Sequence, residues 1–164
     1  MFTLIRNPVD RLVSLYNQQM FEWAIEKKNI TNKSFSLNMW AHSDYHEKDW
    51  ITRHLVNQLE GDLVPGHLEI AKEILRRFCI VGLFESKDES MRRILDYFNF
   101  ELNSDRSIAC KDRTMHYAWR NKLSYRKLHR NSTLYQTLAQ MNPYDMELYD
   151  FAQRLFFHQT ELFE

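Results

Sequence analysis

Two arginines, an asparagine and a serine recur at helical spacing near the N-terminus of the chain. Asn7, Arg11 and Ser14 are separated by four and three residues, so they share one stripe of a helix, and Arg6 directly precedes that stripe. A guanidinium and a hydroxyl beside a helix start suit a phosphate, because unpaired N–H groups and the positive end of the helix dipole point there. The spacing therefore indicates an anion site. The alternative is that Arg6 and Arg11 pair with Asp10 or another carboxylate, and that Ser14 is an ordinary helical serine.

The elements that position this site are a buried strand and the helix that follows it. Residues 2–5 are apolar and partly β-branched, as in a buried strand, and Asn7 followed by Pro8 is typical of a helix start. Apolar residues then recur at helical spacing to about Lys28. A second apolar run, residues 79–84, predicts another buried strand. We expect the two strands to be parallel and close together, with the first helix packed on one face of the sheet.

Helices are expected to fill most of the remaining chain, because only three glycines and three prolines interrupt it. Their expected positions are 50–58, 68–78, 91–98, 121–140 and 144–159. A capping box of Ser86 and Glu89 is expected before the third of these helices. Residues 29–48 and 101–120 are polar and predict two long loops. Strands separated by helices indicate an α/β fold that is predominantly helical, with a short parallel sheet.

Bulk composition narrows the possible classes of function. The 22 basic residues balance the 22 acidic ones, so no overall field favours nucleic acid or an anionic membrane. No apolar run approaches the roughly 20 residues that span a bilayer. Cys79 and Cys110 fit no metal or redox spacing, and they are either a disulfide or two buried thiols. A buried thiol is expected for Cys79, because it lies in an apolar run. No metal site is expected at His42, Asp44 and His46, because no helix or hairpin frames them.

Residues 6–14 (RNPVDRLVS) also resemble a known signature. They are similar to the R-[DN]-P-x-x-R-x-x-S pattern of the PAPS-dependent carbohydrate sulfotransferases of the Golgi. The similarity continues at residues 50–55, 71–85 and 142–157, and it is greatest to the uronosyl 2-O-sulfotransferase branch. The resemblance implies a truncated P-loop-like sulfotransferase fold, with one partial domain over residues 1–164. In that family PAPS donates a sulfuryl group to a carbohydrate hydroxyl, and no metal is required.

The resemblance also implies roles for donor-binding residues. Arg6 and Ser14 correspond to the residues that hold the 3′-phosphate of PAPS, and Arg11 lies on the same stripe. The family has a basic, hydroxyl-containing loop that closes over the donor, and the matching residues here are Lys111, Arg113 and Thr114. The alternative for this loop is an ordinary solvated run of charges.

On the acceptor side, Arg53 corresponds to an arginine in the segment that faces the sugar. Glu47 and Asp49 are near enough in sequence to neutralise Arg53 instead. Glu85 follows the second strand, where ligands of α/β folds bind. It is either an acid in that cleft or a cap or salt-bridge partner at the next helix. The histidines of this region are expected to be surface residues and not bases: His42, His46 and His54. No residue is assigned as the catalytic base.

The sequence lacks a loop rich in Gly, Ser and Thr with a lysine that would wrap the 5′-phosphosulfate, and its three glycines all follow residue 60. We therefore interpret the chain as a fragment, a truncated gene model or a degenerate paralogue, the last being a non-catalytic binding module. The resemblance implies a full-length protein in the Golgi lumen, anchored by an N-terminal segment as a type II membrane protein. Asn29, Asn32 and Asn131 begin glycosylation sequons, which matter only for a luminal protein.

These observations predict that the 164-residue chain alone transfers no sulfate to a glycan, because the residues for the 5′-phosphosulfate and the base are lacking. Incubation of the purified chain with labelled PAPS and heparan or chondroitin precursors measures this directly. Sustained incorporation of label would contradict the interpretation.

Overall fold

Two short strands form the sheet of the computed structural model, which describes residues 1–26, 35–100, 104–120 and 127–163. Strand β1 (Phe2–Ile5) pairs in parallel with β2 (Ile80–Leu83), so that Phe2 lies opposite Ile80 and Ile5 lies opposite Leu83. The predicted parallel pair is confirmed, and β2 is one residue shorter at each end than expected.

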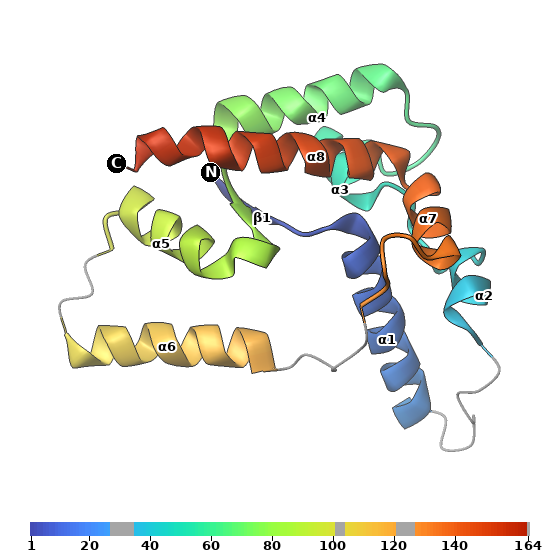
Figure 1. Cartoon of the computed structure of the whole chain (residues 1–164), viewed down its shortest axis with the longest axis horizontal. Coiled ribbons are helices and arrows are strands. Elements are labelled where there is room, and N and C mark those ends of the chain that lie inside the picture. The colour runs from blue at the N-terminus through green and yellow to red at the C-terminus, as the bar shows by residue number, and fades with distance from the viewer. Residues whose placement is uncertain (27–34, 101–103, 121–126, 164) are drawn as a thin grey trace.

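Helices make up most of the rest of the described chain, as Figure 1 shows. Their bounds are α1 (Pro8–Glu26), α2 (Leu37–Ala41), α3 (Trp50–Val56), α4 (Pro65–Phe78), α5 (Lys87–Tyr97), α6 (Asp105–Arg120), α7 (Thr133–Gln140) and α8 (Pro143–His158). Short 3-10 turns follow β2 at Phe84–Ser86 and follow α8 at Gln159–Leu162. The predominantly helical α/β fold with a short parallel sheet is therefore confirmed.

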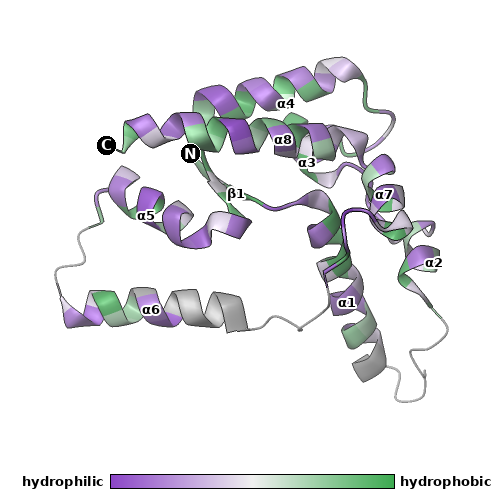
Figure 2. Ribbon diagram, in the orientation of Figure 1, coloured by the Kyte–Doolittle hydropathy of each residue, from purple (hydrophilic) through white to green (hydrophobic). Residues whose placement is uncertain are grey.

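Buried apolar side chains form two clusters in the described chain. The first joins the sheet to α4 and α8 through residues such as Ile5, Leu75 and Leu148. Hydrophobic and hydrophilic residues alternate along α4 and α8 in Figure 2, as expected for amphipathic helices that bury one side. The second cluster joins α1, α2 and α7, and Leu12 and Trp40 are at its centre.

Helix α1 does not cover the sheet as the sequence suggested. Its buried residues Val9, Leu12 and Val13 pack with Trp40 of α2 and Leu138 of α7. Helices α5 and α8 make the most contacts with β2, and α4 packs in the same cluster as the sheet. The apolar stripe of α1 is buried against α2 and α7, so the expected packing of α1 on the sheet was wrong.

The predicted loop at 101–120 is also wrong, because residues 105–120 form helix α6. Two serines mark its start. The backbone N–H of Ser107 donates to Ser104 Oγ at 3.1 Å, and the N–H of Ser104 donates to Ser107 Oγ at 3.2 Å. A serine that bonds the backbone of the first turn is a typical helix start. The polar composition of the segment concealed this signal, and the residues at 101–103 lie outside the described chain.

Two further predicted boundaries differ from the structure. The expected loop at 29–48 contains the short helix α2, whose start is capped by Ser36 Oγ accepting the N–H of Met39 at 3.3 Å. Within the described part of the helix expected from 121 to 140, α7 begins at Thr133 after its N-cap Ser132. Residues 27–34 and 121–126 lie outside the described chain, and with them the sequons at Asn29 and Asn32.

Side chains satisfy the outer edge of β2. Gln159 acts like a neighbouring strand, because its Oε1 accepts the N–H of Val81 and its Nε2 donates to the carbonyl of Cys79, both at 2.8 Å. Ser90 Oγ accepts the N–H of Leu83 and lies 2.9 Å from the carbonyl oxygens of Leu83 and Ser86.

The predicted capping box of Ser86 and Glu89 is wrong. The Ser86 side chain makes no cap hydrogen bond, and a 3-10 turn at Phe84–Ser86 leads directly into α5.

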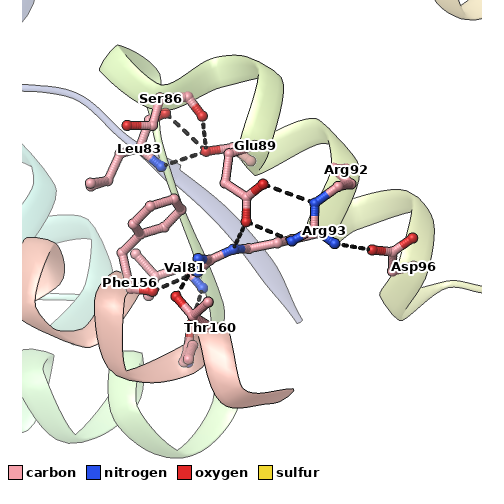
Figure 3. A network of polar contacts seen from close by, with 11 residues as sticks. Val81, Leu83, Ser86, Glu89, Arg92, Arg93, Asp96, Phe156 and Thr160 are labelled. Atoms are coloured by element: carbon pink, nitrogen blue, oxygen red, sulfur yellow. Dashed lines mark hydrogen bonds and ion pairs between the residues drawn. The ribbon is translucent and has the colours of Figure 1, made fainter. Parts of the chain in front are cut away.

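A buried arginine ties α5 to the end of α8 (Figure 3). The side chain of Arg93 is only 2% exposed, and its Nε donates to Glu89 at 2.8 Å. Its other nitrogens donate to the carbonyl of Phe156 and to the hydroxyl of Thr160. The guanidinium also lies 3.8 Å from the centre of the Phe156 ring. Arg92 and Arg93 lower the pKa of Glu89 to about 2, so this carboxylate stays charged at neutral pH.

Both cysteines are free thiols. Cys79 is buried as predicted, and burial raises its pKa, whereas Cys110 is exposed on α6. In the described ranges no helix has both the length and the apolar character needed to cross a bilayer.

The close packing at Gly82 gives a test of the sheet. A methyl group at Gly82 would lie 2.6 Å from Phe2 Cζ and 3.0 Å from Ser90 Cβ, and Ser90 is held by its hydrogen bonds. We expect Gly82→Ala to lower the free energy of unfolding by about 1–3 kcal/mol, the usual cost of overpacking. Urea denaturation measures this change. Gly66→Ala is the matched control, because nothing lies within 4 Å of the added methyl group. Equal stability of the two variants would contradict the packing.

Candidate functional site

The junction between β1 and α1 forms as the sequence predicts. Asn7 is 6% exposed, and its Oδ1 accepts the N–H of Asp10 at 3.2 Å. Its carbonyl accepts the N–H of Arg11 at 2.9 Å, and Pro8 begins the helix. Asn7 is therefore the N-cap of α1. The positive end of the helix dipole lies at this junction, directly beside Arg6.

Glu85 closes the same junction from the end of β2. Its Oε1 accepts the backbone N–H of Asn7 at 3.0 Å. Burial raises the pKa of the Tyr149 hydroxyl on α8, and the charge of Glu85 and a hydrogen bond to it raise this pKa further. Tyr135 on α7 accepts a hydrogen bond from Asn7 Nδ2 at 3.2 Å. Glu85 thus has a capping role, but at the start of α1 and not at the next helix.

The segment before α7 brings two further cations to this junction. Lys127 Nζ lies 3.4 Å from the carboxylate of Asp10. Arg130 lies close enough to Tyr149 for its charge to lower the pKa of that hydroxyl. The start of α1 is therefore surrounded by charges of both signs, from segments far apart in the sequence.

The two arginines of the RNPVDRLVS motif face different neighbours. The Arg6 guanidinium lies 4.8 Å from the centre of the Phe84 ring, at the end of β2. The Arg11 guanidinium lies 4.9 Å from the centre of the Trp50 ring, at the start of α3. Ser14 is partly exposed, about two turns of α1 beyond the N-cap. The structure thus places Arg6 at the helix start and Arg11 against α3.

The residues proposed to close over the donor lie on α6: Lys111, Arg113 and Thr114. This segment is a helix and not the closing loop that the sequence suggested. Arg113 is exposed, and α6 stands apart from α4 and α8 in Figure 1. A regular helix fixes its backbone by internal hydrogen bonds, so it does not wrap a ligand as a loop does.

A buried polar joint connects α3 to α8, and each helix is capped by an aspartate of the other. Asp49 Oδ1 accepts the N–H of Asp145 at 2.9 Å, in the first turn of α8. Asp145 in return accepts the N–H groups of Ile51 and Thr52 at 3.0 and 2.8 Å, and the Thr52 hydroxyl at 2.8 Å. Asn142 Oδ1 accepts the N–H of Asp49 at 3.0 Å. We call Asp49, Thr52, Asn142 and Asp145 the α3–α8 joint.

His46 packs against this joint and is buried, so its predicted place on the surface was wrong. Its Nδ1 lies 2.9 Å from the carbonyl of Ala41 and therefore carries the proton, and its Nε2 accepts from Asn142 at 3.0 Å. Burial lowers the pKa of His46, although both hydrogen bonds oppose this. With both ring nitrogens engaged, His46 is a neutral structural residue. His42 and His54 are exposed as predicted.

An open pocket of about 450 Å³ lies beside the joint. Arg53 reaches it from α3, but its Nε donates to the carbonyl of Lys48 at 3.0 Å, and its Nη1 donates to those of Gln58 and Gly61 at 3.1 and 2.9 Å. Arg53 therefore holds the loops on both sides of α3, which the sequence did not indicate. The residues that line the pocket are His46, Glu47, Lys48, Trp50, Arg53, His54 and Leu59.

Comparison with protein families agrees with the motif at the start of α1. A family model described as "Sulfotransferase family" matches residues 1–152. The chain belongs to the sulfotransferase family. No curated protein and no solved structure matches the chain. The match includes the β1–α1 junction, the α3–α8 joint and most of α8, so these features belong to the sulfotransferase domain.

Several residues at the β1–α1 junction were not assigned to it from the sequence. Three of them, Tyr135, Lys127 and Arg130, come from the C-terminal part of the chain and meet the α1 start only in the folded protein. No motif identifies these three. Tyr149 lies in the family-like segment 142–157, but nothing in that segment indicates its contact with Glu85. Among the residues that the structure describes, no three His, Cys, Asp or Glu side chains gather as metal ligands would.

The contacts of Glu85 give a prediction for the sulfotransferase junction. We expect Glu85→Ala to lower the free energy of unfolding by about 1–2 kcal/mol, because the N–H of Asn7 loses a charged acceptor. The matched control is Glu60→Ala, because Glu60 is exposed. Glu60 accepts a hydrogen bond from Gln58 through its backbone carbonyl, which alanine retains. Thermal or urea unfolding of both variants measures the difference. Equal losses would show that Glu85 does not hold the junction.

Proposed function

We propose that the start of α1 binds the 3′-phosphate of PAPS, and that the domain transfers a sulfuryl group from PAPS to a carbohydrate hydroxyl. The observation that carries this proposal is the strand-to-helix junction, where an N-capped helix begins directly after Arg6. Membership of the sulfotransferase family supports sulfuryl transfer, and the resemblance of residues 6–14 supports the donor and the acceptor class.

The residues at the junction fit a phosphate. Arg6 supplies a permanent charge and a planar donor fork, and the helix start supplies the positive end of its dipole. Ser14 supplies a hydroxyl from the same helix, and Lys127 and Arg130 lie close to the junction. Glu85 occupies the N–H of Asn7, so the phosphate is expected to lie on the Arg6 side of the helix start and not at that amide.

Transfer itself depends mainly on positioning and on groups that stabilise the charge that develops on the leaving phosphate. PAPS supplies the sulfuryl group and leaves as adenosine 3′,5′-bisphosphate. Arg6 and Ser14 are proposed to anchor the nucleotide at its 3′-phosphate, far from the sulfur. Anchoring at this remote group orients the donor, which is how binding energy away from the reacting atoms assists a transfer.

The acceptor is proposed to enter beside α3. The pocket there has a volume within the usual range of small-molecule sites and contains Lys48, Arg53 and His54. Two nitrogens of Arg53 donate to backbone carbonyls, so its side chain is held in place. We propose that Arg53 forms a fixed wall of the pocket and that its positive charge attracts a sugar acceptor.

The cellular setting follows from the same resemblance. We propose a Golgi glycoprotein with type II topology in its full-length form, with the catalytic domain in the lumen. The sequon at Asn131 is exposed immediately before α7, where a glycan would be accessible.

A second candidate is a non-catalytic nucleotide-binding module. Presence or absence of turnover distinguishes the two candidates, whereas nucleotide binding is common to both.

Binding of adenosine 3′,5′-bisphosphate tests the donor site. We expect Arg6→Ala to weaken binding by roughly 10- to 150-fold, or about 1.5–3 kcal/mol, the usual worth of a hydrogen bond to a charged group. Ser14→Ala should weaken it less, because Arg6 carries the charge. Isothermal titration calorimetry measures the affinities of the wild type and of these two variants. Arg76→Ala is the matched control, because Arg76 is exposed on α4 and pairs with Glu73. Unchanged binding by Arg6→Ala would rule out the assigned phosphate contact.

A further inference from the structure

The pocket beside α3 contains a histidine whose ring is fixed at one nitrogen and free at the other. His54 Nδ1 lies 2.8 Å from the carbonyl oxygen of Trp50, one turn earlier in α3. A carbonyl oxygen only accepts, so Nδ1 carries the proton, and Nε2 of the neutral ring is then an acceptor. Of the residues that the structure describes, none forms a hydrogen bond with Nε2. His54 therefore brings an unused acceptor to the lining of the pocket.

The His54 ring is also held by its neighbour Trp50. The two ring centres are 4.0 Å apart and the ring planes are tilted by 34°. Trp50 is itself contacted by α1, because the Arg11 guanidinium lies 4.9 Å from the centre of the indole ring. His54 is thus an exposed side chain that is restrained by a hydrogen bond and a ring contact. A side chain that is restrained before binding loses less conformational entropy when a ligand binds.

We propose that His54 is a specificity-determining residue of the acceptor site, which recognises a sugar hydroxyl by accepting its hydrogen bond at Nε2. The inference rests on the proposed function in taking the ligand of this pocket to be a sugar. It does not depend on the nucleotide site at the start of α1. The role is one of binding, and the proton stays on the hydroxyl.

The groups around His54 suit a hydroxylated ligand. Arg53 holds backbone carbonyls with Nε and Nη1, and its Nη2 has no hydrogen-bond partner within the described chain. The pocket therefore offers an acceptor from His54 and a donor from Arg53, and a hydroxyl group both donates and accepts. The other charged side chains of the lining, Lys48 and Glu47, are exposed and of opposite sign. This mixture of charges suits a sugar better than a phosphate, and about 450 Å³ is within the range of small-molecule sites.

The two neighbouring histidines do not meet the same conditions. His46 lines the pocket, but both of its ring nitrogens are used, by the carbonyl of Ala41 and by Asn142. His42 is exposed and its Nδ1 lies 2.8 Å from the carbonyl of Asn38, which is the same bond as in His54. However, His42 is not part of the pocket lining. Of these three histidines, only His54 combines a free Nε2 with a place in the pocket, and His42 is its matched control.

The test is titration of the whole chain with an unsulfated chondroitin tetrasaccharide, followed by the ¹⁵N resonances of the imidazole rings. We expect His54 in the free protein to carry its proton on Nδ1. Addition of the tetrasaccharide should shift the Nε2 resonance of His54 and leave that of His42 in place. A proton on Nε2 in the free protein, or an Nε2 resonance of His54 that does not move, would overturn the proposal.

Substitutions measure how much the hydrogen bond contributes to binding. We expect His54→Ala to weaken tetrasaccharide binding by roughly 2- to 12-fold, the usual net worth of a neutral hydrogen bond. His42→Ala should leave it unchanged. His54→Gln should retain more affinity than His54→Ala, because its amide oxygen reaches about as far as Nε2 and also accepts. Equal affinities for the His54→Ala and His42→Ala variants would show that Nε2 binds no hydroxyl.

A parallel titration with adenosine 3′,5′-bisphosphate separates this inference from the proposed donor site. Tetrasaccharide binding that depends on His54, in a chain that does not bind the nucleotide, would support the role of His54 and refute the donor site. Nucleotide binding in a chain whose His54 resonances ignore the tetrasaccharide would support the donor site and overturn the role of His54.

Discussion

The fold depends on two helix starts that are capped by each other's aspartates. Asp49 and Asp145 are 96 residues apart in the sequence, yet each supplies the acceptor that the other's helix needs. This exchange fixes α3 to α8 where both begin. At its other end, α8 leads into Gln159, which completes the edge of β2, and β2 in turn holds β1 in register. The start of α1, which follows β1 directly, is therefore supported by elements that the α3–α8 joint helps to hold in place.

A sheet of two strands has little stability of its own, and this chain compensates with side chains. Gln159 and Ser90 accept hydrogen bonds from the backbone of β2 on its outer edge. Arg93 on α5 donates to the carbonyl of Phe156 near the end of α8 and so links the two helices. All three are buried polar residues whose hydrogen bonds are met, so they add specificity without leaving an unpaired group. The sulfotransferase junction thus receives its support from residues outside the motif that first indicated it.

Local signals in the sequence predicted local structure well. Asn7 and Pro8 predicted the start of α1, and two apolar runs predicted the parallel strands, because caps and buried strands depend on neighbouring residues. Contacts between distant segments were not predictable in this way. Glu85 bonds Asn7 across 78 residues, and nothing near Glu85 distinguishes that partner from the next helix. His46 resembled a surface histidine because its polar neighbours gave no hint of Asn142, and α6 resembled a loop because its serine cap lies in a polar segment.

We propose that the β1–α1 junction recognises a 3′-phosphate. Backbone amide shifts in ¹⁵N-labelled protein, compared between adenosine 3′,5′-bisphosphate and adenosine 5′-monophosphate, measure this recognition. We expect shifts specific to the bisphosphate to centre on residues 6–14, since only the 3′-phosphate distinguishes the two ligands. Identical shifts for both nucleotides, or bisphosphate-specific shifts centred on the pocket between His46 and Leu59, would contradict it.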